Sequence, residues 1–235
     1  MSWSFPIGRL FGSELRVHVT FFLLLAWIGG EAYMAAGPMA AAINVGFVLS
    51  LFLCVVAHEY GHALMARRYG IPTPDITVLP IGGLARLARM PERPSAEIAV
   101  ALAGPAVNVA IWAVLTAFGA SADTGMFFGD GGASFLGSLS AVNLFLVLFN
   151  MIPAFPMDGG RVLRAVLALR FDRLRATKIA AGAGQALAVG FAVWGVTSGN
   201  PLLVLIAVFV FMAASAEAKA MEQRMRSVHF PHVRR

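Results

Sequence analysis

The 235-residue chain is 59% hydrophobic and only 13% charged, and its formal net charge is +6. Soluble proteins average about 45–50% apolar and about 25% charged residues, so the composition excludes an ordinary soluble enzyme and indicates a polytopic membrane protein. The single cysteine, Cys54, excludes an internal disulfide framework.

Six apolar runs, each close to the length that crosses a bilayer, predict about six transmembrane helices. They cover residues 18–37, 41–66, 96–120, 135–152, 178–198 and 201–218. All 18 lysines and arginines lie before the first run, between the second and third, between the fourth and the start of the fifth, or after the sixth. By the positive-inside rule both termini are cytoplasmic. The basic surplus is therefore a topology signal, and no nucleic-acid partner is expected.

The predicted fold class is an all-α polytopic membrane protein with short β-strands at the cytoplasmic membrane interface. We expect one membrane-embedded domain over residues 1–235. Interfacial strands occupy 1–17, a six-helix core 18–220 and a cytoplasmic tail 221–235. No signal peptide is expected, because the first apolar run follows no basic region and precedes no cleavage pattern.

The first 18 residues predict short strands around Phe5 and from Glu14 to His18. His18 is interpreted as an interfacial histidine, because it lacks the paired spacing of a metal-binding motif.

The second apolar run contains His58, Glu59 and His62 in the pattern His-Glu-x-x-His. On a helix the two histidines lie one above the other, with Cβ atoms about 5–6 Å apart, so both imidazoles can bind one metal ion. Glu59 lies where it can take a proton from a metal-bound water. At 1.5 Å per residue, His62 lies about 7.5 Å and His58 about 13.5 Å from Arg67, which places the metal inside the bilayer near its cytoplasmic face. Cys54, one turn earlier, is interpreted as a small apolar filler rather than a ligand.

Residues 71–92 contain too many prolines and glycines for a helix. Ile76 to Leu79 and Leu84 to Leu87 predict short strands around a turn at Gly82 and Gly83. An exposed strand edge near a hydrolytic metal can hold an extended peptide by strand addition, which makes the two glycines candidates for substrate binding. A hairpin that only joins two helices explains the same pattern.

Two buried amides and one carboxylate are the remaining polar candidates. Asn108, in the third run, needs a partner and either bonds a neighbouring helix or faces the reaction centre. Asn150 ends the fourth run, and Asp158 follows it in an irregular stretch rich in proline and glycine. Irregular backbone at a membrane boundary is tolerated where protein or water surrounds it. A hydrolytic zinc site uses three protein ligands, so Asp158 is the candidate third ligand, although an aspartate that caps the next helix fits too.

The fifth run carries small residues four apart at Gly182, Ala186 and Gly190. This spacing predicts a stripe for close helix packing.

Three motifs occur in order along the chain. They are His58-Glu59-Tyr60-Gly61-His62, Gly104-Pro105-x-x-Asn108 and Asn150-x-x-Pro153-x-x-Pro156-x-Asp158-Gly159-Gly160. Together they resemble the site-2 protease family of intramembrane zinc metalloproteases, peptidase family M50. The glycine pair at 82–83 and the six-helix layout fit its bacterial and archaeal branch. Unlike many members of that branch, this chain leaves no room for a CBS or PDZ domain.

The resemblance implies one zinc ion per chain, bound by His58, His62 and Asp158, with Glu59 as the catalytic acid and base. Asn150 and Asn108 would be oxyanion-stabilising or substrate-positioning helpers. The implied reaction is hydrolysis of a peptide bond within or near a substrate's transmembrane helix, as in regulated intramembrane proteolysis. Implied substrates are membrane-tethered transcription factors, anti-sigma factors or signal-peptide remnants, at a bacterial or archaeal cell membrane.

Two functions of other classes compete. A metal transporter would also place histidine and aspartate in the membrane, but it would need a polar path through the outer leaflet, and the outer halves of the helices offer almost none. An inactive scaffold would bind transmembrane partners without cleaving them. The complete His-Glu-x-x-His and aspartate set argues against a scaffold.

Overall fold

The computed structural model describes residues 3–79, 82–86, 88–89, 91, 93–123 and 134–229. The chain forms two compact units. The first comprises Met1–Pro91 and Ala103–Leu148, and the second comprises Glu92–Leu102 and Phe149–Arg235.

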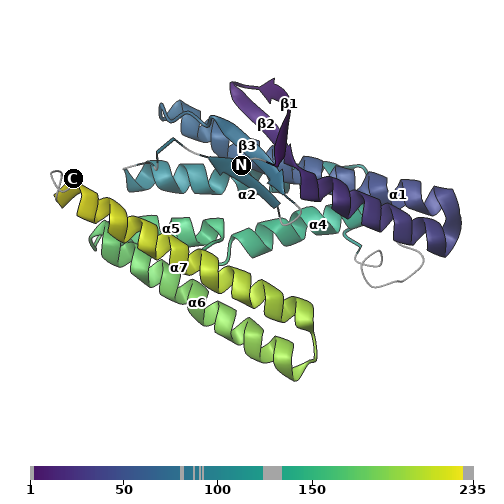
Figure 1. The fold of residues 1–235 in the computed structure, drawn as a ribbon. Helices are drawn as coiled ribbons and strands as arrows, with labels where there is room; N and C mark the ends of the chain where they lie inside the picture. Colours follow the sequence, from purple (N-terminus) through teal and green to yellow (C-terminus); the bar gives the residue numbers. More distant parts are fainter. Residues whose placement is uncertain are drawn as a thin grey trace. The chain divides into compact units, whose positions relative to one another are not determined.

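Helix α1 (Val19–Arg68) is a hairpin of two helices rather than one rod (Figure 1). Its backbone leaves helical geometry at Ala36 and Gly37, and Gly37 has φ +80°. A glycine with positive φ ends a helix and a proline starts the next one, which is the role of Pro38. The fold-back brings the rings of Phe21 and Phe52 to 4.4 Å between centroids. The first two predicted spans are therefore joined by a turn of almost no length.

A four-stranded sheet lies against this hairpin in the order β1-β2-β3-β4. The strands are β1 (Ser4–Leu10), β2 (Ser13–His18), β3 (Asp75–Leu79) and β4 (Gly82–Arg86). β2 and β3 pair in parallel, with Val17 opposite Val78, while both outer pairs are antiparallel. Val17 and Val78 pack with Phe21 and Phe52 in one buried cluster, which fixes the sheet to α1.

The second strand pair corrects one prediction. Gly82 and Gly83 are the first residues of β4 and pair with Leu79 and Val78, so the prediction of a turn at the two glycines is wrong. The pattern of apolar residues indicated a hairpin but did not determine its register. In the structure both glycines are paired residues of β4 rather than turn residues. Leu87, which was predicted to end this strand, lies outside the described residues.

The rest of the first unit consists of residues 103–117 of α2 (Pro94–Ala117) and most of α4 (Phe135–Asn150). At Gly61, α1 touches α2 so closely that an added Cβ would lie 2.6 Å from the Ala103 carbonyl oxygen. Phe47 and Cys54 of α1 pack with Leu139 and Val142 of α4. These contacts bring three helices together around the His-Glu-x-x-His segment.

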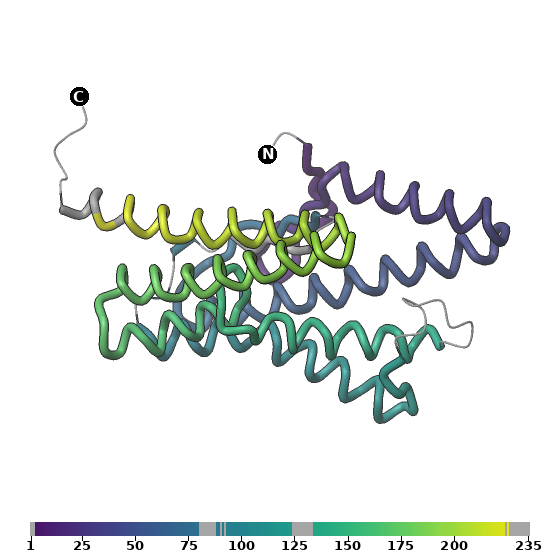
Figure 2. Tube along the Cα trace, turned by 90° about the horizontal axis from the view of Figure 1, so that it is seen from below, coloured from purple at the N-terminus to yellow at the C-terminus, as the bar shows by residue number. Residues whose placement is uncertain are grey.

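The second unit contains α5 (Asp158–Leu167), α6 (Arg173–Thr197) and α7 (Pro201–His229). α6 and α7 form an extended helical hairpin (Figure 2). The buried side chain of Phe155 packs on Ala180, Ala181 and Ala214. A Cβ on Gly184 would lie 2.0 Å from the Phe155 carbonyl oxygen, so α6 needs a glycine at this position for close packing.

The predicted packing stripe on this helix is wrong. Gly182, Ala186 and Gly190 are exposed in the structure, and a Cβ added at either glycine meets nothing within 4 Å. A spacing of four marks one helix face without saying which way the face points. The packed face instead carries Ala180, Ala181, Gly184 and Ala188.

A buried charge cluster ties the second unit together. The guanidinium of Arg164 donates from Nε to Oε1 of Glu97 at 2.6 Å and from Nη1 to Oε1 of Glu217 at 2.7 Å. Arg173 donates to the other oxygen of Glu97 at 2.8 Å. Arg164 is 0% exposed and Glu97 only 4%, so neither charge is solvated and each depends on its partners.

Among the described residues, four helices are long and apolar enough to cross a membrane: α1, α2, α6 and residues 201–223 of α7. α4 is a shorter apolar helix, and α1 contains two spans. The prediction of a mainly helical, multi-pass membrane protein with short strands is confirmed.

Candidate metal centre

His58 and His62 lie one turn apart on the second half of α1, and both are buried. Their Nε2 atoms are 3.0 Å apart and their rings are nearly perpendicular, at 81°. Two imidazole nitrogens that face each other at this distance can both reach one zinc ion, because Zn–N bonds are about 2.0–2.1 Å long. This geometry agrees with the predicted metal-binding pair.

A chain of buried hydrogen bonds sets the tautomer of the His58 imidazole. It starts at the carbonyl oxygen of Leu139, which can only accept, and which receives a hydrogen bond from Nδ2 of Asn143 at 2.9 Å. The other amide atom of Asn143, Oδ1, must therefore accept, and it receives Nδ2 of Asn108 at 2.8 Å. Oδ1 of Asn108 then faces Nδ1 of His58 as an acceptor.

This order has a direct chemical consequence. Nδ1 of His58 carries the proton and donates a hydrogen bond to Oδ1 of Asn108. Nε2 is therefore unprotonated and presents its lone pair toward His62. A metal-binding histidine usually donates its second ring nitrogen in this way, which fixes its tautomer and its ring orientation. Asn108 is 0% exposed. Its side chain bonds both Asn143 on the neighbouring helix α4 and His58, so the two alternatives considered for it, a bond between helices and a place beside the histidines, occur together.

Sequence reasoning missed Asn143 as a member of this chain. Asn143 is a fully buried amide in the middle of α4, and an isolated asparagine within an apolar run was the available signal. Its Nδ2 also donates to Sγ of Cys54 at 3.3 Å, so the thiol accepts a hydrogen bond in addition to filling space.

Gly104 provides the space next to the histidines. A Cβ at this position would lie 2.2 Å from Nε2 of His62 and 2.7 Å from Nε2 of His58. No side chain fits there without displacing both rings. The glycine of the Gly-Pro motif therefore brings the α2 backbone directly against the Nε2 atoms of both histidines.

Other predicted residues lie as follows in the first unit. Glu59 is half-buried beside His58 on α1. Gly82 and Gly83 begin β4, an edge strand of the sheet. His18 caps the start of α1, with its Nδ1 2.8 Å from Oγ1 of Thr20.

Asp158 and Asn150 belong to the second unit. Asp158 is the first residue of α5 and only 6% exposed, and Nη1 of Arg161 lies 4.0 Å from its Oδ1. The N-cap of α5 is Met157, so Asp158 lies in the first turn of the helix, where the competing interpretation also places it. Asn150 is the last residue of α4 and is half-buried.

The fold and this centre define a class: a multi-pass membrane protein with a His-Glu-x-x-His metal site inside a membrane-crossing helix. The model of peptidase family M50 matches residues 46–125 and 120–191. The chain is 38% identical over 222 residues to the zinc metalloprotease MJ0392 of Methanocaldococcus jannaschii, a match that covers 94% of this chain and 62% of that protein. It is 28% identical to the stage IV sporulation protein FB of Bacillus subtilis, over 94% of this chain and 69% of that protein.

Among solved structures, the site-2 protease from Methanocaldococcus jannaschii superposes with a TM-score of 0.66 and 36% identity. The match covers 92% of this chain and 95% of the solved one. The chain therefore belongs to peptidase family M50, a family of zinc metalloproteases. The predictions of this family and of zinc as its metal are confirmed.

Proposed function

We propose that the protein is an intramembrane zinc metalloprotease that hydrolyses a peptide bond within or near the transmembrane helix of a substrate. The observation that carries the proposal is the pair of facing Nε2 atoms of His58 and His62, 3.0 Å apart inside a membrane-crossing helix. Buried ionisable groups in hydrocarbon are costly, so a paired set with its own hydrogen-bonded support indicates function.

We assign zinc binding to His58, His62 and Asp158. The burial of Asp158 supports its assignment as the third ligand, as does the donor set itself, since two imidazoles and a carboxylate are typical of hydrolytic zinc. When bound, zinc supplies a Lewis acid that lowers the pKa of a coordinated water to about 7.

Glu59 takes the role of general base and acid. Next to His58 on the same helix, its carboxylate accepts the proton of the attacking water and returns it to the leaving amine. Asn108 holds His58 in the tautomer that keeps Nε2 available. For Asn150 we propose a role in stabilising the oxyanion or positioning the substrate.

The substrate has to unwind before cleavage, because a transmembrane helix hides its peptide bonds in backbone hydrogen bonds. We propose that the edge strand β4, beginning with Gly82 and Gly83, receives the unwound segment as an added strand. Regulated intramembrane proteolysis of transcription factors, anti-sigma factors or signal-peptide remnants is the proposed setting. The positive-inside rule supports cytoplasmic termini in a cell membrane. The two units would then act as one protease domain.

The test compares the wild type with Glu59→Gln, using the purified chain in lipid nanodiscs and a transmembrane substrate with a helix-breaking segment. We expect the variant to retain about one zinc per chain and to lose hydrolysis by at least about 100-fold, the contribution of a general base. Cleavage by the variant at the wild-type rate would contradict the assignment. Zinc uptake into sealed vesicles, without hydrolysis by either protein, would instead identify a transporter.

A further inference from the structure

Asp158, the third residue to which we assign zinc binding, directly follows an irregular segment of the second unit, residues 151–157, which links α4 to α5. The first turn of α5 packs tightly against this segment. A Cβ added at Gly160 would lie 2.5 Å from the backbone nitrogen of Phe155 and 2.5 Å from the carbonyl carbon of Ala154. Because the two backbones touch with no side chain between them, a shift of the segment also shifts Asp158.

Phe155 attaches the segment to α6 and α7. Its side chain is only 2% exposed and packs on Ala180, Ala181 and Ala214. Its backbone N–H donates to the carbonyl oxygen of Ala180 at 3.3 Å. Its own carbonyl oxygen lies against Gly184, where an added Cβ would be 2.0 Å away. The place of the segment in the second unit is therefore set at Phe155.

The guanidinium of Arg164 holds the ring of Phe155 from α5. Its Cζ atom lies 5.0 Å from the ring centroid, which is within the range of a cation–π interaction. The guanidinium is itself fixed, because it donates to a carboxylate oxygen of Glu97 at 2.6 Å and to one of Glu217 at 2.7 Å. A planar guanidinium can bind carboxylates at its edge and an aromatic ring on its face at the same time.

We propose that Arg164, acting through Phe155, is a positioning residue for the carboxylate of Asp158. This inference rests on the proposed role of Asp158 as a zinc ligand. A zinc ligand has to be held within a few tenths of an ångström, and an irregular segment needs support from its surroundings to do so. The stacked pair supplies that support, since it fixes the residues that lead into Asp158 to the body of the second unit.

The first test measures the zinc affinity of the purified full chain by competition with a chelator of known affinity. Phe155→Met keeps most of the apolar volume and removes the aromatic face. We expect zinc affinity to fall about tenfold, the lower end of the loss caused by removing the outer support of a ligand. Phe171→Met is the matched control, because the Phe171 ring pairs with Arg175 at 5.1 Å but is 39% exposed and lies outside the segment. Equal affinities in the two variants would overturn the proposal.

A spectrum distinguishes positioning from a general effect on stability. Cobalt(II) can replace zinc, and its visible absorption depends on the geometry of its ligands. We expect the spectrum of cobalt-loaded Phe155→Met to differ from that of the wild type, and the spectrum of Phe171→Met to match it. A lower denaturation midpoint in Phe155→Met with unchanged zinc affinity and an unchanged cobalt spectrum would make the residue purely structural and overturn the proposal.

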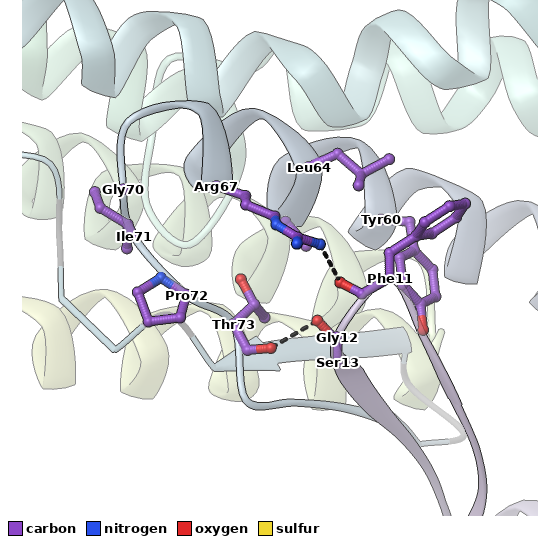
Figure 3. Close-up of a pocket in the computed structure, with 11 residues that line it drawn as sticks. Phe11, Gly12, Ser13, Tyr60, Leu64, Arg67, Gly70, Ile71, Pro72 and Thr73 are labelled. Atoms are coloured by element: carbon purple, nitrogen blue, oxygen red, sulfur yellow. Dashed lines mark hydrogen bonds between the residues drawn. The ribbon is translucent and has the colours of Figure 1, made fainter.

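Arg164→Lys tests the other member of the pair. Lysine keeps the positive charge beside the carboxylates but has no planar group to stack on the ring, so we expect a similar fall in zinc affinity. Arg67→Lys is the control, because Arg67 lies in the first unit and donates to the Phe11 carbonyl of the β1–β2 turn at 2.9 Å (Figure 3). Wild-type affinity in folded Arg164→Lys would contradict the proposal. Phe155→Met decides the question if Arg164→Lys does not fold, because it leaves the charge cluster intact.

Asp158→Asn in the same assay separates this inference from the proposed function. Wild-type zinc affinity in Asp158→Asn would remove the proposed ligand and the positioning role together. Loss of zinc in Asp158→Asn with wild-type affinity in Phe155→Met would refute the positioning role alone.

Discussion

Nδ1 of His58 donates a hydrogen bond to Oδ1 of Asn108, and this single bond leaves Nε2 as the histidine nitrogen with a free lone pair for a metal ion. The direction of this bond follows from the backbone carbonyl of Leu139, which can only accept. That carbonyl fixes the orientation of the Asn143 amide, and Asn143 in turn fixes the orientation of the Asn108 amide. The metal centre is thus prepared by α2 and α4 as well as by the helix that carries the motif.

Removal of this amide weakens metal binding. For Asn108→Ala we expect zinc affinity to fall about 10- to 100-fold, the usual effect of losing an outer partner of a metal-binding histidine. Competition with a chelator of known affinity measures the change. Asn44→Ala is the control, because that amide donates to the Ala40 carbonyl of its own helix at 2.9 Å, away from the metal centre. Equal affinities in the two variants would refute the role assigned to Asn108.

A methyl group at Gly104 closes the site. The added Cβ of Gly104→Ala would lie 2.2 Å from Nε2 of His62, so we expect a folded protein that has lost zinc. Metal analysis of the purified variant gives the answer. Gly46→Ala is the matched control, because a Cβ there meets nothing within 4 Å. Full zinc content in Gly104→Ala would show that the helices relax enough to admit a side chain.

The third ligand is tested by Asp158→Asn, which removes the charge and keeps the shape. We expect zinc content to drop from about one per chain to near zero after dialysis against a weak chelator. Arg161→Gln serves as the control, since it removes the guanidinium that lies 4.0 Å from Oδ1 of Asp158 and leaves the carboxylate in place. Zinc retention by Asp158→Asn equal to that of the wild type would mean that another residue supplies the third ligand.

The buried charge cluster governs the stability of the second unit. Arg164→Met leaves Glu97 buried with Arg173 as its remaining partner, so we expect a loss of about 3–5 kcal/mol in the free energy of unfolding. Denaturant titration in detergent micelles measures this loss. Lys178→Gln breaks an exposed ion pair with Glu222, which should cost at most about 1 kcal/mol. Similar losses in the two variants would show that burial does not set the energy of the cluster.

Local chemistry made part of this architecture predictable. The apolar runs predicted the spans, and the spacing of His58 and His62 predicted a pair on one helix face, because both follow from the helical repeat. Long-range partners were not predictable in the same way. Nothing in the sequence near residues 13–18 indicates that they pair with residues 75–79. Likewise, the sequence around Asn108 does not indicate that its partner is Asn143 on another helix. The stripe at Gly182 failed for the same reason, since direction on a helix depends on neighbours.

The parallel pairing of β2 with β3 has a consequence for how the protein is made. β2 ends where α1 begins, and β3 starts a few residues after α1 ends, so the two strands leave the ribosome on either side of a complete membrane hairpin. They can meet only when both halves of α1 have inserted and both ends have returned to one side of the bilayer. The pairing of β2 with β3 therefore depends on the fold-back of α1 at Gly37, although the sheet and that turn share no residue.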